Sequence, residues 1–336
     1  MLVSELKKIL EVSCMLGKGF APVTEYTYFN GKDVRATNME AFLALEVENP
    51  MPFNSCILTE KMNKFLTSMD GGTDLTFITN DNTLDITYGK KNKFIIPTQP
   101  LADFPDLPSI KYNDADLLCS IQLTEDFIKR LIDASKFIST TDNRFNGVYL
   151  KNDKIYSSNR EIIYVGDVDA GYENTIFIPY NLIKLLTKFK KTFNILEVYS
   201  CGFKATGFGS ILYYANYEDN TMPDFDRVIS SHKDFFQVTV TEELKNSINR
   251  IKLFDEIVNV CIKDRVINIT TNNINETIDI VDFVSNEEYT FKFNTTYLNK
   301  LVDCETISFT QKADDKTISA IKAIGENYKI LCAVVL

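Results

Sequence analysis

Six stretches of the chain repeat their apolar residues at helical spacing, each with a residue suited to a helix start. They begin near Ser4, Thr59, Thr124, Pro179, Thr241 and Asn294. Three starts are Thr-Glu pairs, in which the hydroxyl can cap the helix and the acid suits its positive N-terminal end. The pattern therefore predicts six amphipathic helices.

Between these stretches lie short runs in which apolar and polar residues alternate, as in half-buried strands. Clear examples are 74–78, 83–88, 147–151, 195–199 and 278–283. Three or four such runs follow each predicted helix, so the same pattern occurs six times along the chain. We expect an α+β protein with antiparallel sheets, divided at the Pro-rich segment 97–114 and the polar segment 219–234.

Short motifs recur at nearly constant intervals. FPDL at 104–107 returns as MPDF at 222–225, a shift of 118, and the Thr-Glu pair at 124 returns at 241, a shift of 117. Three strand-like runs end in similar corners, at 36–38, 157–159 and 270–272, with shifts of 121 and 113. Because 336 residues divided by 3 is 112, these shifts predict three tandem domains, at 1–113, 114–233 and 234–336.

Charge is distributed unevenly. The chain has 36 Lys and Arg against 46 Asp and Glu, a net charge of −10, which taken alone argues against binding DNA. However, the predicted helix at 179–196 has four lysines and no acid, and the other predicted helices carry eleven further bases, whereas acids gather in turns and strands. These bases are either the solvated faces of ordinary helices or one shared surface that contacts phosphates without reading bases.

The residues that could carry enzyme chemistry are few. The only histidine, His232, lies in a polar stretch, which argues against a histidine triad or a histidine-rich metal site. Seven scattered cysteines without a C-x-x-C pair favour a reducing compartment, and no apolar run is long enough to span a membrane. We therefore expect a cytoplasmic protein with no catalytic residues, metal or cofactor. A hydrolase that uses clustered carboxylates and a metal is the enzyme alternative.

Four segments carry a resemblance to a known family: FIKRLIDA at 127–134, DNRFNG at 142–147, MPDFDRVI at 222–229 and YKILCAVVL at 328–336. Over its whole length the chain resembles the bacterial DNA polymerase III beta subunit, the DNA sliding clamp, in a divergent phage-type form. The resemblance implies three clamp domains, each with two helices and antiparallel sheets. Two subunits would close head to tail into a ring around duplex DNA, a non-enzymatic processivity factor that tethers the replicative polymerase to its template.

The resemblance also assigns sites. The basic residues expected to contact double-stranded DNA without sequence preference are Lys7, Lys8, Lys64, Lys129, Arg130, Lys136, Lys184, Lys188, Lys190, Lys191, Lys245, Arg250 and Lys300. A pocket for DNA polymerase and clamp-loader peptides maps onto Phe145, Ser157, Ile162, Pro223, Arg227, Val228, Ile318, Ala320, Ile330, Leu331, Cys332 and Val334. The homodimer interface maps onto Phe94, Ile96, Leu253 and Phe254.

Each of these assignments has an alternative. The pocket residues could be core between two domains, and the interface residues could be internal packing. The pocket also departs from the family: its T-D-G-H-R corner is SSNRE at 157–161 here, and its M-P-M-R ending is CAVV at 332–335. A three-domain interaction scaffold that never encircles DNA is the functional alternative.

Overall fold

The computed structural model describes residues 1–17, 19–113, 115–169, 174–215, 221–280, 287–301, 304–312 and 317–334. Within these residues the chain forms eight α-helices: α1 (Val3–Leu16), α2 (Thr59–Thr67), α3 (Ser109–Asn113), α4 (Glu125–Ser135), α5 (Tyr180–Lys188), α6 (Phe225–Ser231), α7 (Glu242–Ile251) and α8 (Thr295–Leu301). All six expected helices are present, each beginning within one residue of its expected start. The α3 and α6 helices were not expected, and they lie in the two segments that the sequence suggested as joints.

The chain folds as two compact units. The first contains Met1–Glu125 and Leu185–Asp219, and the second contains Asp126–Lys184 and Asn220–Leu336. The expected middle domain, 114–233, therefore contributes strands to both units.

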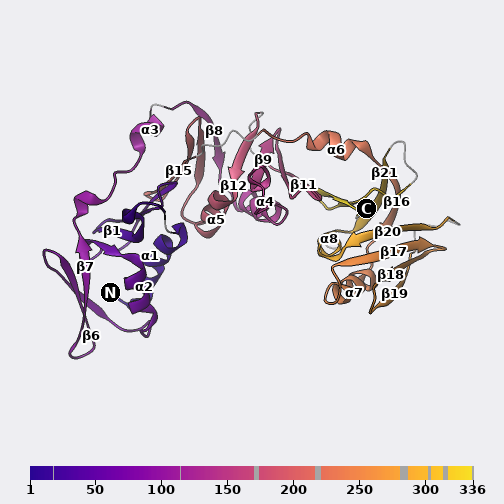
Figure 1. Cartoon of the computed structure of the whole chain (residues 1–336). Coiled ribbons are helices and arrows are strands. Elements are labelled where there is room, and N and C mark those ends of the chain that lie inside the picture. The colour runs from indigo at the N-terminus through magenta and orange to yellow at the C-terminus, as the bar shows by residue number, and fades with distance from the viewer. Residues whose placement is uncertain are drawn as a thin grey trace. The chain divides into compact units, whose positions relative to one another are not determined.

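The first unit contains one antiparallel sheet of eleven strands, in the order β5-β6-β7-β4-β1-β2-β3-β15-β14-β13-β8 (Figure 1). Its strands are β1 (Tyr26–Asn30), β2 (Asp33–Thr37), β3 (Ala41–Glu46), β4 (Asn54–Leu58), β5 (Leu75–Thr79), β6 (Thr83–Tyr88), β7 (Asn92–Gln99), β8 (Leu117–Gln122), β13 (Ile195–Tyr199), β14 (Gly202–Gly207) and β15 (Ser210–Ala215). The described part of this unit also has the short 3-10 turns Pro22–Glu25 and Leu101–Asp103.

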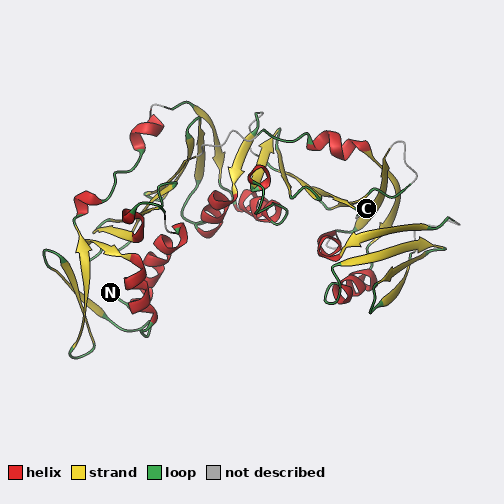
Figure 2. Cartoon of the chain, in the orientation of Figure 1, coloured by secondary structure: helices red, strands yellow, loops and turns green. Residues whose placement is uncertain are grey.

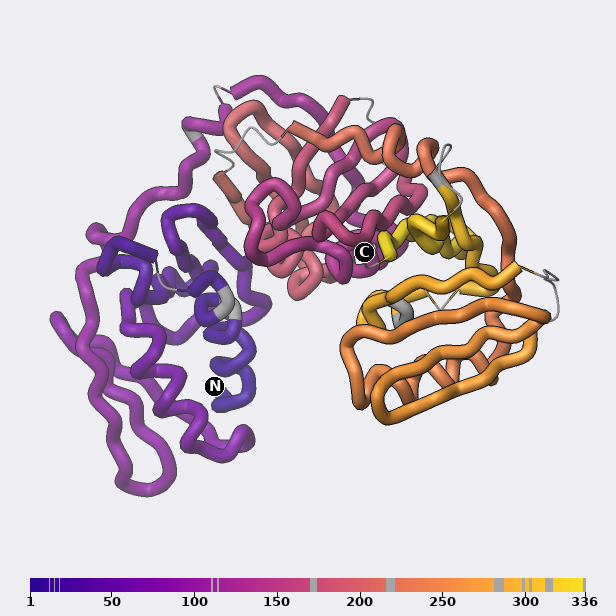
Figure 3. The backbone as a smooth tube through the Cα atoms, turned by 45° about the vertical axis from the view of Figure 1, so that its right-hand side comes forward, coloured from indigo at the N-terminus to yellow at the C-terminus, as the bar shows by residue number. Residues whose placement is uncertain are grey.

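The second unit contains two antiparallel sheets. Eight strands follow the order β12-β9-β10-β11-β23-β22-β21-β16, and four follow β19-β18-β17-β20, drawn in orange in Figure 3. Their bounds are β9 (Gly147–Lys151), β10 (Lys154–Ser158), β11 (Ile162–Asp167), β12 (Ile176–Pro179), β16 (His232–Thr239), β17 (Ile257–Lys263), β18 (Val266–Thr270), β19 (Asn275–Asp279), β20 (Tyr289–Asn294), β21 (Thr306–Lys312), β22 (Ala320–Ile324) and β23 (Tyr328–Ala333).

The strand order repeats three times. The four strands after α1, α4 and α7 lie in the orders β4-β1-β2-β3, β12-β9-β10-β11 and β20-β17-β18-β19. The three strands after α2, α5 and α8 form the meanders β5-β6-β7, β13-β14-β15 and β21-β22-β23. The end of one meander then pairs with the outer strand of the preceding set, as β15 with β3 and β23 with β11. The α+β class with antiparallel sheets, expected from the sequence, is confirmed.

The strand predictions hold except in one place. The runs 83–88, 147–151 and 195–199 coincide with β6, β9 and β13, and the run 74–78 is displaced by one residue from β5. Of the run 278–283, the first two residues end β19, Ile280 follows the strand, and residues 281–283 lie outside the described residues. Burial alternates along β19 and continues past its end to the buried Ile280, so alternation does not mark where the strand ends.

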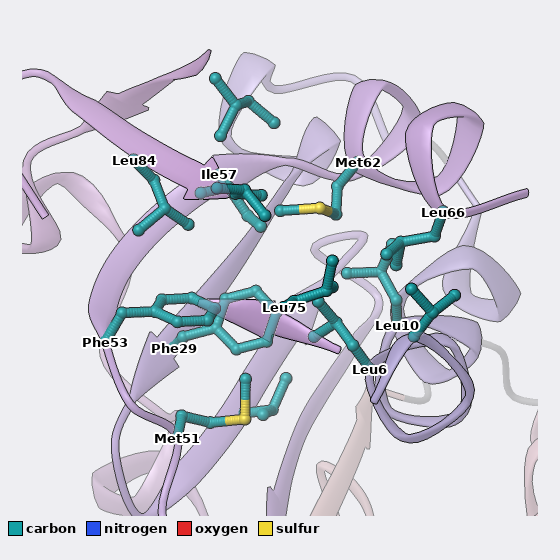
Figure 4. Close-up of a cluster of buried hydrophobic side chains, with 14 residues drawn as sticks. Leu6, Leu10, Phe29, Met51, Phe53, Ile57, Met62, Leu66, Leu75 and Leu84 are labelled. Carbon is teal, nitrogen blue, oxygen red and sulfur yellow. The ribbon is translucent and has the colours of Figure 1, made fainter. Parts of the chain in front are cut away.

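The packing of the helices on the sheets determines which face of each helix stays exposed to solvent. In the first unit α1 and α2 lie side by side (Figure 2) and bury apolar residues at helical spacing. Leu6 and Leu10 of α1 meet Met62 and Leu66 of α2 over the sheet residue Ile57, all five fully buried (Figure 4). Each such side chain contributes about 1.5–3 kcal/mol through its burial. The polar residues of both helices are left on the opposite face.

Candidate nucleic-acid interface, subunit joint and peptide pocket

Basic residues occupy the helix faces that do not pack on the sheets. In α1, Lys8 is exposed while Leu6 and Leu10 are buried, and in α4, Lys129 is exposed while Leu131 is buried. This placement follows from the 3.6-residue period of the helix, which puts the apolar and basic residues on different sides. A basic side chain on such a face can reach a phosphate without unpacking the core.

The thirteen basic residues expected to contact DNA fall into groups. Lys8, Lys129, Lys190 and Lys191 are exposed, and within the described residues no acid pairs with them. Three others form ion pairs within their own helical segment, Lys64 with Glu60 at 2.6 Å, Lys136 with Asp133 at 2.7 Å and Lys245 with Glu242 at 3.0 Å. Exposed pairs of this kind contribute about 0–1 kcal/mol and leave the lysine available to a stronger anion.

Two of the expected DNA contacts are engaged inside the second unit. The Arg130 side chain is only 12% exposed, 3.7 Å from Asp126, and its Nη2 lies 3.1 Å from the side-chain amide of Asn327. Lys300 Nζ donates to the Lys136 carbonyl oxygen at 2.5 Å and lies 4.7 Å from the centre of the Phe137 ring. Burial lowers the pKa of Lys300. The structure therefore gives these two side chains internal roles, and the DNA surface proposed below omits them.

Three further bases have specific partners. Arg250 on α7 pairs with Glu276 of β19 through both Nε and Nη2, each at 2.8 Å. Hydrogen bonding to Glu276 raises the pKa of Arg250, and the same bond lowers the pKa of Glu276. Lys7 Nζ donates to the Met69 carbonyl oxygen at 3.4 Å, and Lys188 on α5 pairs with Glu11 on α1 at 2.5 Å. Among the thirteen expected DNA contacts, Arg250 is thus the one that the described residues show in a bidentate pair with an acid.

The β7 half of the expected subunit interface presents a different residue from the ones assigned. Ile96 is fully buried in the core of its own unit, and the Phe94 ring stacks on Phe65 with centroids 4.1 Å apart. Because successive strand residues face opposite sides, the residue between them, Ile95, faces outward and is 49% exposed. Ile78 on β5 is also exposed, at 59%. The structure corrects the assignment of Ile96, whose side chain has no free surface, and offers Ile95 in its place.

The other half of the expected interface is exposed in the second unit. Leu253 is 74% exposed and Phe254 61%, directly after α7, and Ile257 at the start of β17 is 50% exposed. Three large apolar side chains this close in sequence make an apolar surface that the second unit does not cover itself. Such a surface is typical of a contact with another protein.

The twelve expected pocket residues divide between two sides of the eight-stranded sheet. Ser157, Ile162, Ile330 and Cys332 are at most 2% exposed and, by strand alternation, lie on the same face. Ser157 Oγ on this face donates to the Ala134 carbonyl oxygen of α4 at 2.7 Å. These four buried residues are interior to the second unit, as in the alternative that they are core.

The opposite face of the sheet carries a separate apolar cluster. It contains Ala320 and Leu331 from the expected set, with Phe145 at its edge. The α6 helix packs on it through Phe225, and Val228 of α6 remains 42% exposed. The other members of the set are placed as follows: Arg227 exposed, Pro223 half-buried, Ile318 and Val334 buried.

The cluster also contains residues that the sequence did not suggest as site residues. Tyr149, Tyr156, Ile163 and Phe177 belong to its buried part, and the Phe225 ring stacks on Tyr156 with centroids 5.8 Å apart. Their only signal was that they lie in the apolar strands β9–β12, and any sheet core gives the same signal. At the other end of the 3-10 turn Asn143–Phe145, a cavity of about 510 Å³ is polar, lined by Ser139, Thr141, Asp142, Asn143, Asn159 and Arg160.

Comparison with known proteins identifies the architecture. The sequence matches no protein-family model and no curated protein. The structure is similar over 100% of its length to the DNA polymerase III subunit beta from Pseudomonas aeruginosa, with TM-score 0.78, 16% identity and 99% of that chain covered. The chain has the sliding-clamp fold. This clamp fold confirms, at the level of architecture, the resemblance carried by the four sequence segments.

Other similar structures have the same clamp fold. The Helicobacter pylori beta clamp bound to a DNA ligase peptide aligns over 100% of this chain and 99% of its own, with TM-score 0.81 and 10% identity. The Caulobacter crescentus pol III beta aligns over 100% and 99%, with TM-score 0.77 and 14% identity. At these identities the similarity establishes the clamp fold and not the residues of any site.

Two further features of the described residues concern metal sites and membrane spans. No three His, Cys, Asp or Glu side chains among them gather closely enough to hold a metal ion. No helix in that part of the clamp fold is long and apolar enough to cross a membrane.

Proposed function

We propose that the chain is a DNA sliding clamp, a homodimeric ring that encircles duplex DNA and tethers a polymerase to it. The observation that carries the proposal is the strand repeat, which leaves one sheet edge open at each end of the series. The three clamp domains that this repeat supports are 1–113, 114–233 and 234–336. The ring would act in the cytoplasm and without catalysis of its own.

The two open edges complement each other. Within the described residues β19 pairs only with β18, and β7 pairs with β4 only at Thr98 and Gln99, so Asn92–Pro97 has a free edge. By position in the repeat, β19 corresponds to β3 and β11, and β7 corresponds to β15 and β23. Pairing of β7 with β19 of a second copy would therefore repeat the pairing of β15 with β3 and of β23 with β11 within one chain. Two such joints close a ring and leave neither edge exposed.

The exposed apolar residues support the same joint. Ile95 lies on β7, and Leu253, Phe254 and Ile257 lie in the part of the chain that carries β19. Their burial in a dimer would add apolar contact to the backbone pairing. A joint of this kind is an obligate one, in which an apolar surface accompanies paired strands.

The charge distribution supports DNA as the partner. Exposed lysines occupy helix faces, while the chain as a whole carries ten excess negative charges. A basic lining attracts phosphates without regard to sequence, and the acidic remainder discourages binding elsewhere. Loose contact of this kind permits sliding, because no base is held.

The peptide site is proposed on the α6 side of the eight-stranded sheet. There Phe145, Pro223 and Val228 are partly or largely exposed around the buried Ala320 and Leu331. An extended polymerase or clamp-loader peptide could place an apolar side chain against this cluster. The Helicobacter pylori beta clamp, a protein of the same fold that is bound to a DNA ligase peptide, supports a peptide as the partner.

The shape of the oligomer tests the proposal. Native mass spectrometry should give twice the chain mass, and negative-stain images should show a ring with a hole wide enough for duplex DNA. A monomer at every micromolar concentration, or an open chain of subunits, would contradict it.

A second experiment tests encirclement without a loading enzyme. The ring is locked by a disulfide across the proposed joint while it is mixed with a closed circular plasmid. Locked protein should stay on the circle through a high-salt wash and leave when the plasmid is cut once. Equal loss from the closed and the cut plasmid would favour a scaffold that does not encircle DNA.

A further inference from the structure

One helix of the chain differs from the others in charge. From Tyr180 to Phe193, α5 and the turn after it carry Lys184, Lys188, Lys190 and Lys191 and no acid, a local charge of +4. All four side chains are exposed. We call these four lysines the α5 patch.

The charge on the surface of α7, in the last third of the chain, is neutralised. Residues 241–256 hold three bases and four acids, a local charge of −1. Lys245 pairs with Glu242, and Arg250 forms its bidentate pair with Glu276. A phosphate that approached Arg250 would have to displace the carboxylate of Glu276, which also accepts a hydrogen bond from Ser247 at 3.0 Å. The α7 surface therefore offers little net attraction to DNA.

The remaining helices lie between these extremes. Residues 3–16 of α1 hold two lysines and two glutamates, and residues 125–136 around α4 hold three bases and three acids, so both segments are neutral. The last third has one base on α8, Lys300, and its ammonium group is already bound to the Lys136 carbonyl oxygen and faces the Phe137 ring. Attraction between charges at a surface falls off within about 8–10 Å in physiological salt. The net charge of each helix segment therefore decides where phosphate is held.

We infer that the α5 patch supplies most of the electrostatic contact with DNA, and that the last third of the chain contributes little. Each subunit thus holds the duplex at one place and not evenly around its inner surface. The inference rests on the proposed function, since it presumes that DNA passes these helices. It names the phosphate backbone of duplex DNA as the ligand of the patch.

Within the patch, Glu11 acts against DNA binding. Its carboxylate pairs with Lys188 at 2.5 Å, and both side chains are about half exposed. Replacing Glu11 with Gln removes a negative charge from the edge of the patch and frees the Lys188 ammonium group. The variant should bind DNA more tightly than the native chain, a gain that general destabilisation cannot produce.

The test measures binding to a short linear duplex, where retention by encirclement plays no part. Fluorescence anisotropy over a series of NaCl concentrations gives the slope of log K against log salt, about −0.9 per phosphate contact. The variant K188Q/K190Q/K191Q should lose about 2 to 3 units of slope for each subunit engaged. The matched variant K245Q/R250Q/K252Q in the last third should lose less than about 1. Glu11→Gln should tighten binding by about 2-fold or more, the size of one surface ion pair.

The outcomes separate this inference from the proposed function. Equal slope losses in the two triple variants, or no gain in Glu11→Gln, would overturn the inference. If the native ring still remains on closed circular plasmid in that case, the clamp proposal stands and only the location of the contact is wrong. Far-ultraviolet circular dichroism and the dimer mass of each variant confirm that the fold is intact.

Discussion

At the scale of single residues, the three strand corners share one hydrogen-bond pattern, although the residue that makes it differs. In each corner a side-chain oxygen accepts from two backbone N–H groups. Asn38 Oδ1 accepts from the backbone N–H groups of residues 40 and 41, and Asn159 Oδ1 accepts from those of residues 161 and 162. In the last corner Thr271 Oγ1 takes this role, accepting from residues 273 and 274. The sequence match had aligned Asn272 with the two asparagines, so it was displaced by one residue. The true interval between the last two corners is 112, one third of the chain.

The corner at Asn159 gives a stability prediction. Asn159→Ala removes the acceptor for two backbone N–H groups and the donor to Tyr297 Oη at 2.9 Å. The loss should destabilise the protein by about 1–3 kcal/mol, seen as a lower urea midpoint. The matched variant Thr271→Asn should change stability by less than about 0.5 kcal/mol, because it supplies an equivalent acceptor. A large loss in Thr271→Asn would contradict the equivalence of the two corners.

The Arg250–Glu276 pair gives a pH prediction. Hydrogen bonding to Arg250 lowers the pKa of Glu276, so the folded state favours the carboxylate. A lowered pKa contributes stability above the unfolded value of about 4.3 and loses it as the pH falls through the folded value. The urea midpoint of Glu276→Gln should therefore lie below that of the native chain at neutral pH, and the gap should close as the pH falls below the unfolded value of about 4.3. The exposed Glu326, changed to Gln, serves as control and should show no such convergence.

At the scale of elements, sequence pattern predicted the helices that have apolar periodicity and most of the half-buried strands, and it missed α6, which has no such periodicity. The α6 helix has seven residues and one buried side chain, Phe225, so it has no apolar periodicity. Its start is fixed locally, because the Asp224 side chain accepts from the Arg227 N–H at 3.0 Å. That cap needs tertiary support from the cluster beneath Phe225, which no local pattern reveals. The proposed peptide site therefore draws only partly on the sequence: some of its apolar residues were named there, but not the sheet face on which each lies.

The proposed joint between β7 and β19 can be tested by cross-linking. Ile95 and Asn275 lie on the outward-facing positions of their strands. Ile95→Cys with Asn275→Cys should form a disulfide between two copies under mild oxidation, seen as a doubled band on a non-reducing gel. Each single variant controls for the native cysteines. Ile95→Cys with Leu118→Cys on the exposed β8 should give no link, and a link of equal yield there would argue against the joint.

At the scale of the whole molecule, the net charge of −10 conceals its distribution. The net charge adds the charges of all surfaces together, so it argues against DNA binding even though some helix faces carry a concentration of bases. The proposed dimer likewise depends on surfaces that only a second copy can cover. The apolar residues Leu253 and Phe254, 74% and 61% exposed in one chain, are the clearest of these.

Removing this apolar surface should separate the subunits. The variant with Leu253→Ala and Phe254→Ala should remain folded and soluble but run as a monomer, with dimer affinity reduced by about 100-fold or more. The matched control is Phe20→Ala, because Phe20 is a fully exposed aromatic residue outside the proposed joint, and this change should leave the dimer unchanged. Sedimentation velocity distinguishes the two results. A persistent dimer in the double variant would show that the interface lies elsewhere.

The sequence by itself determined the positions of six of the eight helices in the described residues, the α+β class, the period of about one third of the chain and the basic charge of the segment 180–193. These properties depend on local periodicity and composition, which each segment carries within itself. Only the tertiary structure decided that Ile95 and not Ile96 faces outward, that Lys300 and Arg130 are used internally, and that Glu276 neutralises Arg250. Each of these depends on which residues distant in sequence become neighbours, and that is set by strand register and helix packing.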